Sequence, residues 1–181
     1  AESVDEFESE PLGPALNKFN LYFAYCVPNE CSLGNKEVQF KSGSEFGLEY
    51  QREFLDQSYL GLSWGMKSFD TTGTAGGYEL KGSNSLMRFD FTLGQEWEFT
   101  DTLSILTQGS IGIATSSYEV KVPDLSYTLY DSSATSFHYA ILLGLKLEWN
   151  DSWHSALFYE FDGRSESNLM DYQSFHQFGI E

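Results

Sequence analysis

The segment 136–149 alternates between large apolar side chains and, with the exception of Leu142, small or polar ones. The apolar positions are Phe137, Tyr139, Ile141, Leu143, Leu145, Leu147 and Trp149. Because successive side chains of a β-strand point to opposite faces, this period of two predicts a strand. The predicted strand is longer than the roughly five or six residues usual in globular proteins. It matches a strand that crosses a bilayer, which needs about 9–11 tilted residues with aromatic side chains at both interfaces.

Other segments show the same alternation, and no segment has a clear helical period. The further predicted strands are about 18–27, 44–54, 58–67, 85–99, 103–117, 152–162 and 172–181. Short connections at 55–57, 100–102 and 150–151 alternate with long ones at 28–43, 68–84, 118–135 and 163–171. In an antiparallel up-and-down sheet, this order puts every short turn at one end and every long loop at the other. The sequence therefore predicts an all-β fold, an eight-stranded antiparallel up-and-down transmembrane β-barrel over residues 18–181.

The composition limits the partners and the membrane topology. The chain has 181 residues, enough for one domain, and its formal net charge of −17 at pH 7 argues against nucleic acid as a partner. No run of about 18 apolar residues is present, so a transmembrane helix is not expected. A barrel remains possible, because a barrel strand exposes only alternate residues to lipid.

The polar faces of the predicted strands are expected to line the interior, because an eight-stranded barrel has room only for side chains there. Glycines collect on these faces, together with charged residues. The predicted interior polar network is Glu49, Arg88, Asp90, Glu96, Lys146, Glu148 and Glu160. An unpaired buried charge costs several kcal/mol, so we expect ion pairs, with the excess acids near the wet rims. The reverse orientation would crowd all the tryptophans into the lumen.

Aromatic residues lie beside the predicted tight turns. Trp97 and Phe99 precede one turn, while Trp149 and Trp153 flank another. This is where a periplasmic aromatic belt is expected. The predicted lipid-interface aromatics are Trp64, Trp97, Phe99, Phe137, Tyr139, Trp149 and Trp153.

The N-terminal segment and the two cysteines lead to further predictions. Residues 1–17 are acidic, contain two prolines and lack periodicity, which predicts a flexible leader. The chain begins Ala1-Glu2, as expected of a mature exported product after signal cleavage. In such a protein Cys26 and Cys31 favour a disulfide over a pair of buried thiols. Four ligands are needed for a structural zinc site, so the cysteine pair does not predict metal.

Three stretches resemble the small outer-membrane barrels of the OmpX/Ail and opacity-protein type. They are SLMRFDFTLGQEWEFTDTLSILTQGSIGIA (85–114), LLGLKLEWNDSWHSALFYEF (142–161) and the tail SFHQFGIE. The resemblance implies a monomeric barrel without cofactor in a Gram-negative outer membrane, in contact with lipopolysaccharide. It also implies adhesion or defence roles. Such barrels normally end in an aromatic residue, whereas this chain ends Gly179-Ile180-Glu181, so we expect that the last few residues are missing.

Catalysis is not predicted. His138 and His176 are expected near the loop end and His154 near the turn end, so they cannot share a metal. Some small barrels, the PagL-type lipid A deacylases, use a His/Ser/Glu site. Ser136/His138 and Ser174/His176 each share a face, as a nucleophile and its base must, but the His-x-Ser order of those enzymes is absent.

Alternation persists into the long loop 118–135, at Val120, Val122, Leu125, Tyr127 and Leu129. These residues could form an exposed β-edge that recruits host or envelope proteins by strand addition, or simply an ordered surface loop.

The main functional prediction from the sequence is a non-enzymatic structural or surface-interaction barrel. Alternatives are an accessory subunit of a larger complex docked through the leader, a small-molecule binding or passage protein, and a soluble lipocalin-like carrier. Passage is disfavoured because the predicted lumen looks plugged.

Overall fold

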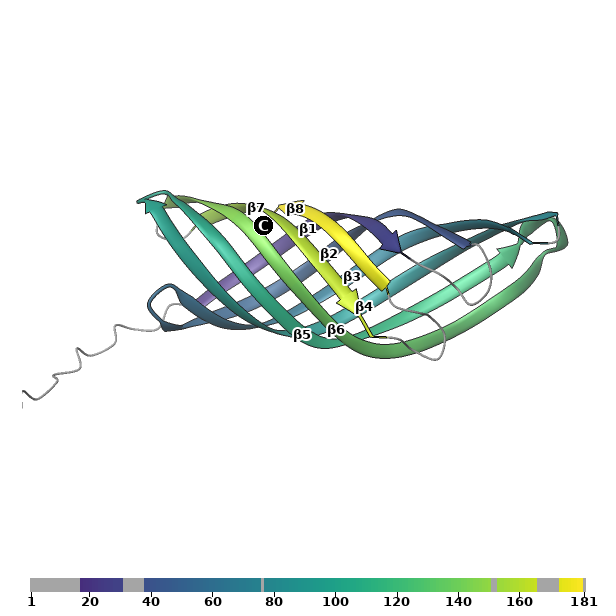
Figure 1. Cartoon of the computed structure of the whole chain (residues 1–181), viewed down its shortest axis with the longest axis horizontal. Coiled ribbons are helices and arrows are strands. Elements are labelled where there is room, and N and C mark those ends of the chain that lie inside the picture. The colour runs from purple at the N-terminus through teal and green to yellow at the C-terminus, as the bar shows by residue number, and fades with distance from the viewer. Residues whose placement is uncertain (1–16, 31–37, 76, 151–152, 166–172, 181) are drawn as a thin grey trace, which may run out of the picture.

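The protein is a closed barrel of eight antiparallel strands, each paired with its neighbours in the chain and β8 paired with β1 (Figure 1). The computed structural model describes residues 17–30, 38–75, 77–150, 153–165 and 173–180. The elements are β1 (Asn17–Glu30), β2 (Val38–Leu55), β3 (Ser58–Ala75), β4 (Tyr78–Thr100), β5 (Leu103–Val122), the 3-10 turn η1 (Pro123–Leu125), β6 (Tyr127–Asn150), β7 (Trp153–Arg164) and β8 (Gln173–Ile180). This confirms the predicted fold class.

The barrel wall is apolar outside and polar inside. On β6, Ile141 and Leu145 are 66% and 53% exposed, whereas the alternate residue Lys146 is 2% exposed. A closed barrel pairs every backbone group of its wall, which is the condition for sheet structure in hydrocarbon. An apolar exterior on such a barrel is stable only against lipid, so the protein spans a membrane.

No helix among the described residues is long and apolar enough to cross a membrane.

Side-chain hydrogen bonds fix the tight turns at one end of the barrel. Thr100 Oγ1 accepts hydrogen bonds from the backbone N–H groups of Thr102, at 3.3 Å, and Leu103, at 3.1 Å. Asn150 Oδ1 accepts one from the N–H of Trp153 at 3.0 Å. Such local bonds explain why Thr and Asn occupy these positions.

The strands β3 to β6 continue far beyond the residues predicted for them at the opposite end (Figure 1). β3 and β4 stay paired up to Ala75 and Tyr78, so the prediction of a long loop over 68–84 is wrong. β5 and β6 likewise run through most of 118–135. The reason is that the outward side chains here are polar, so the row of outward apolar residues that marks a membrane strand ends while the strand continues.

A row of outward-facing serines marks the upper limit of the apolar exterior. Neighbouring strands place them side by side: Ser44, Ser68, Ser85, Ser117 and Ser133. We call this set the serine row. One step further along the strands, the same face carries Asp70, Ser83, Glu119 and Asp131. The part of β3–β6 above the serine row is therefore in water, and we call it the extracellular extension.

Candidate functional site

Arg88 on β4 is the centre of a buried ion-pair cluster inside the barrel. Its Nε lies 2.8 Å from Glu45 Oε1 on β2, and its Nη1 lies 2.8 Å from Glu160 Oε1 on β7. Asp90 Oδ2 lies 3.7 Å from Nε. Tyr22 accepts a hydrogen bond from Arg88 Nη2 and donates one to Glu45, each at 3.1 Å. The cluster joins four strands through fully desolvated charges.

Lys67 and His138 extend the cluster toward the loop end. Lys67 Nζ lies 3.3 Å from Glu45 Oε2 and also binds Asp162 on β7. His138 on β6 has its Nδ1 2.8 Å from Asp90 Oδ1 and its Nε2 3.9 Å from Asp162 Oδ1. The imidazole therefore lies between two buried carboxylates, which fixes its orientation.

Glycines on β2 and β3 make room for this cluster. A Cβ added at Gly47 would collide with the ring of Tyr22, and one at Gly65 would lie 2.6 Å from the Tyr22 hydroxyl and 3.0 Å from Arg88 Nε. Both positions are inward-facing, in agreement with the expectation that small residues line an eight-stranded lumen.

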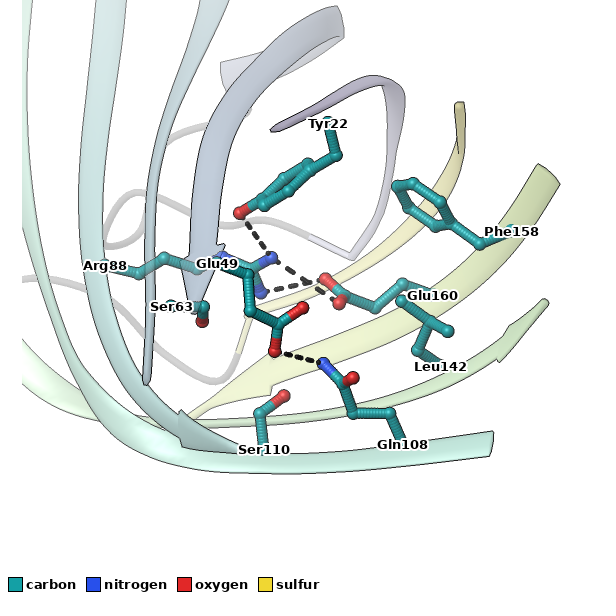
Figure 2. Close-up of a pocket in the computed structure, with 9 residues that line it drawn as sticks. All are labelled: Tyr22, Glu49, Ser63, Arg88, Gln108, Ser110, Leu142, Phe158 and Glu160. Atoms are coloured by element: carbon teal, nitrogen blue, oxygen red, sulfur yellow. Dashed lines mark hydrogen bonds and ion pairs between the residues drawn. The ribbon is translucent and has the colours of Figure 1, made fainter. Parts of the chain in front are cut away.

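A small cavity separates this cluster from a second polar layer, which contains Glu49, Gln51 and Gln108 (Figure 2). Its volume of about 10 Å³ is close to the space that one water molecule needs. Gln108 Nε2 donates to Glu49 Oε1 at 3.0 Å, and Gln51 Nε2 donates to Gln108 Oε1 at 2.9 Å. The cavity is walled by polar and apolar groups: Tyr22, Glu49, Ser63, Arg88, Gln108, Ser110, Leu142, Phe158 and Glu160.

A second ion-pair group closes the turn end of the lumen. Glu96 on β4 binds Lys18 Nζ at 2.7 Å and Lys146 Nζ at 3.0 Å. Lys146 also binds Glu148 Oε1 at 2.7 Å, although the Glu148 side chain is 47% exposed at the rim. The Lys18 ammonium lies 3.8 Å from the centre of the Tyr59 ring. Paired charges and a cavity of one-water size make this interior a packed core.

The structure places Glu49, Arg88, Asp90, Glu96, Lys146 and Glu160 inside the barrel and Glu148 at its turn-end rim. The predicted network omits the partners Lys18, Tyr22, Glu45, Lys67, His138 and Asp162, although the alternation puts His138 in the polar interior. Most of them lie on the inward parity of their strands, so the alternation was the available signal. Alternation shows that these residues face inward. It does not show which of them form ion pairs, because pairing depends on the stagger between strands.

Ser136 and His138 do not form a nucleophile and base pair. His138 bonds to Asp90, and Ser136, two residues away, makes no hydrogen bond with it. His154 is half-buried near the turn end, and the side chain of His176 lies outside the described residues. No group of three potential metal ligands occurs in the described ranges.

The predicted disulfide is not supported. The Cys26 side chain is fully buried on the inward face of β1. Cys31 lies outside the described residues, as does the leader up to residue 16.

The predicted interface aromatics all lie on the outward face. Trp97, Phe99, Trp149 and Trp153 are 56–72% exposed beside the turns, and Phe137 is 51% exposed at the other end of the band. The tryptophan N–H groups find partners, since Trp149 donates to Ser155 Oγ at 3.0 Å and Trp97 to Thr107 Oγ1 at 3.4 Å. Trp64 and Tyr139 are half-exposed.

The candidate interaction residues divide between the two faces of the extension. Val120 and Val122 are 4% and 6% exposed on the inward face, so their expected exposure is wrong. They lie beside Leu80 of β4, which is likewise buried on the inward face. Leu125 and Tyr127, at the tip of the β5–β6 hairpin, are 57% and 59% exposed. The side chain of Leu129 lies outside the described residues.

One edge of the extension lacks a described partner strand. β7 ends at Arg164, which pairs with His138, and Ser165 bonds to Phe137. Among the described residues, the segment 127–136 of β6 therefore pairs only with β5. The backbone N–H and C=O groups of Phe137 point toward β7. The direction of these groups alternates along a strand, so those of the odd-numbered residues that precede Phe137 on β6 point toward this open edge. Asp131, Ser133 and Thr135 are the regular members of this set.

No protein-family model matches the sequence, and no curated protein is significantly similar to it. Solved structures match over nearly the whole barrel. Neisserial surface protein A superposes with a TM-score of 0.64 at 9% identity, over 92% of this chain and 97% of that one. Ail, the attachment invasion locus protein of Yersinia pestis, in complex with the heparin analogue sucrose octasulfate, gives 0.51 at 11% identity, over 92% and 95%. A second Ail structure gives 0.50 at 12% identity, over 91% and 95%.

These superpositions establish a shared fold. The resemblance to small outer-membrane barrels of the OmpX/Ail type is thus confirmed for the architecture. A closed barrel of this fold with an apolar exterior is an outer-membrane protein, which confirms the predicted location. The short turns are then periplasmic and the extension is extracellular.

Proposed function

We propose that this protein is a non-enzymatic surface-interaction barrel that recruits a protein partner by strand addition at the open edge of β6. The observation that carries the proposal is the segment 127–136, which stands above the membrane and, among the residues that the structure describes, pairs on one side only. Unpaired strand edges are templates for another chain, because their N–H and C=O groups still need partners.

The composition of the edge supports this role. Natural proteins protect exposed edges with lysine, proline or inward charges, whereas residues 127–136 contain neither proline nor lysine and a single acid, Asp131. Its inward side chains Ser132, Ala134 and Ser136 are small and half-buried, so an added strand could approach closely. Asp131, Ser133 and Thr135 each direct an N–H and a C=O to this edge, so they offer about three main-chain hydrogen-bonding positions.

An apolar tip next to this edge could supply side-chain contacts. Leu125 and Tyr127 are exposed at the β5–β6 tip, and Tyr78, at the start of β4, is 46% exposed. Exposed apolar groups that gather at one place mark interaction sites more often than scattered ones do. The acids Asp124 and Asp131 flank this tip, so the favoured partner is an extended segment with apolar and basic residues.

Passage of solutes has less support, because ion pairs fill the lumen at both levels. A role as an accessory subunit depends on residues 1–16, which lie outside the described residues, and it stays a prediction.

The test compares Ser133→Pro with Ser133→Ala in bacteria that display the full chain. Proline removes an N–H that points to the open edge and leaves the hydrogen bonds between β5 and β6 intact, whereas alanine keeps that N–H. Adhesion to epithelial cells and to immobilised matrix proteins should fall about tenfold with proline and stay unchanged with alanine. Heat-modifiable migration on SDS gels checks that both variants fold.

Equal adhesion by the two variants would exclude strand addition at this edge. Adhesion no greater than that of bacteria without the barrel would overturn the interaction role itself.

A further inference from the structure

A groove of about 660 Å³ lies on the lipid-facing wall of the barrel. It begins beside Phe54 and Ser58, at the turn between β2 and β3, and continues across β4, β5 and β6. Its far end lies at Ile141 and Leu143, in the middle of the apolar face of β6. The groove therefore runs from the periplasmic rim toward the centre of the membrane.

Gly109 forms the floor of the groove. It faces outward on β5 between Leu93 of β4 and Ile141 of β6, whose side chains are 52% and 66% exposed. A Cβ added at Gly109 would meet nothing within 4 Å, so the space above it is open. The next outward residue on the same strand, Ile111, restores the full thickness of the wall. A single missing side chain thus produces a trough between two apolar ridges.

The periplasmic end of the groove is polar. Ser58 Oγ donates to Gln95 Oε1 at 2.5 Å, and Thr107 Oγ1 donates to the backbone oxygen of Gln95 at 3.3 Å. Trp97, two residues closer to the turn, donates to Thr107. Tryptophans of the interfacial belt mark the depth of lipid head groups. The amide and hydroxyls therefore lie just below the head groups, at the depth of the ester groups of a phospholipid.

An exposed cation lies on β2, the strand that contributes Phe54 to the groove. Arg52 is exposed on the outward face of β2, two residues from Phe54, and it pairs with Leu60, the neighbour of Leu93. A guanidinium group binds phosphate oxygens in a bidentate manner. Other cations near this end, Lys18 and Lys146, are inside the barrel and bound to Glu96.

We propose that this groove binds one glycerophospholipid of the periplasmic leaflet. Its phosphate contacts Arg52, its ester groups contact Ser58, Gln95 and Thr107, and one acyl chain lies over Gly109 between Leu93 and Ile141. The polar collar at the periplasmic end and the apolar trough beyond it match the order of ester groups and acyl chain in the lipid, and Arg52 on β2 supplies the cation for its phosphate. Lipopolysaccharide lies in the opposite leaflet, so its head group cannot reach this polar end.

The first test fills the trough. The full chain is reconstituted in nanodiscs of phosphatidylethanolamine and phosphatidylglycerol, transferred to mild detergent, and examined by native mass spectrometry. Gly109→Leu should reduce the retained phospholipid about fivefold, since it occupies the space of the acyl chain. Ile113→Leu, a change on the same face of the same strand outside the groove, should leave retention unchanged. Equal retention by Gly109→Leu and the wild type would overturn the proposal.

The second test locates the lipid. A phospholipid with a diazirine on its acyl chain should crosslink mainly to residues 93–95, 107–111 and 141–143 on illumination. Arg52→Gln should weaken retention about threefold, whereas Lys81→Gln, in the extracellular extension, should have no effect. Crosslinks spread evenly around the apolar band would mean ordinary annular lipid and would refute a specific site.

Discussion

The strands β3 to β6 reverse their polarity where they leave the membrane. Below the serine row the outward side chains are apolar, such as Phe89 and Ile111, and the inward ones are charged, such as Arg88. Above it the outward side chains are polar, and the inward ones, Leu80 and Tyr118 among them, are apolar and buried. Along the same continuous strands, the polar and apolar faces are therefore exchanged.

This reversal shows that the solvent decides which face is polar. In hydrocarbon an outward charge is costly, so charges turn inward and must pair there. In water the ordinary rule of soluble sheets returns, and the inward side becomes a small apolar core. The serine row separates the two regimes because a hydroxyl is tolerated in both.

The largest loss of stability is expected when Arg88, the central cation of the membrane-spanning part, is removed. Arg88→Leu leaves Glu45 and Glu160 buried without their guanidinium, and the free energy of unfolding should fall by about 3–5 kcal/mol. Urea titration of the barrel in lipid vesicles measures this loss. The matched change Lys81→Leu removes an exposed ion pair, at 3.3 Å from Glu79, in the extracellular half. It should leave stability nearly unchanged.

A loss of similar size for both variants would mean that the two halves do not differ as proposed.

A lysine on the outward face should distinguish the two regimes along one strand. Ile111→Lys puts a charge into the apolar band and should cost about 2–4 kcal/mol, whereas Ser117→Lys, three outward positions higher, should cost about 0–1 kcal/mol. Unfolding in vesicles gives both values. Equal costs would place Ser117 within the hydrocarbon and move the boundary upward.

The same contrast explains how far the sequence could predict the structure. Inside the membrane, alternation is strong, as from Phe137 to Trp149, and it correctly predicted the strands and their outward faces. In the extension the contrast between successive side chains is lower, so the sequence of residues 68–84 predicts a loop where the structure has two paired strands. Val120 and Val122 were assigned to the exposed side because the reversal could not be foreseen from either half alone.

The ion pairs of the lumen were only partly predictable. The inward parity of Arg88 and Glu160 could be read from the chain, yet they are 72 residues apart and meet through the stagger of the closed barrel. Stagger depends on all eight pairings together, so no local pattern shows which acid reaches which base. The lipid-facing groove likewise depends on a single glycine seen against its cross-strand neighbours.

The smallest effect is expected at the boundary itself. Ser85 lies in the middle of the serine row, between Ser68 and Ser117. Ser85→Leu extends the apolar exterior by one residue at a depth where water and lipid meet, so the change in unfolding free energy should stay within about 0.5 kcal/mol. A gain above about 1 kcal/mol would show that leucine is removed from water there. The boundary would then lie above the row, among Asp70, Glu119 and Asp131, whose carboxylates would have to face lipid; a near-zero value keeps them in water.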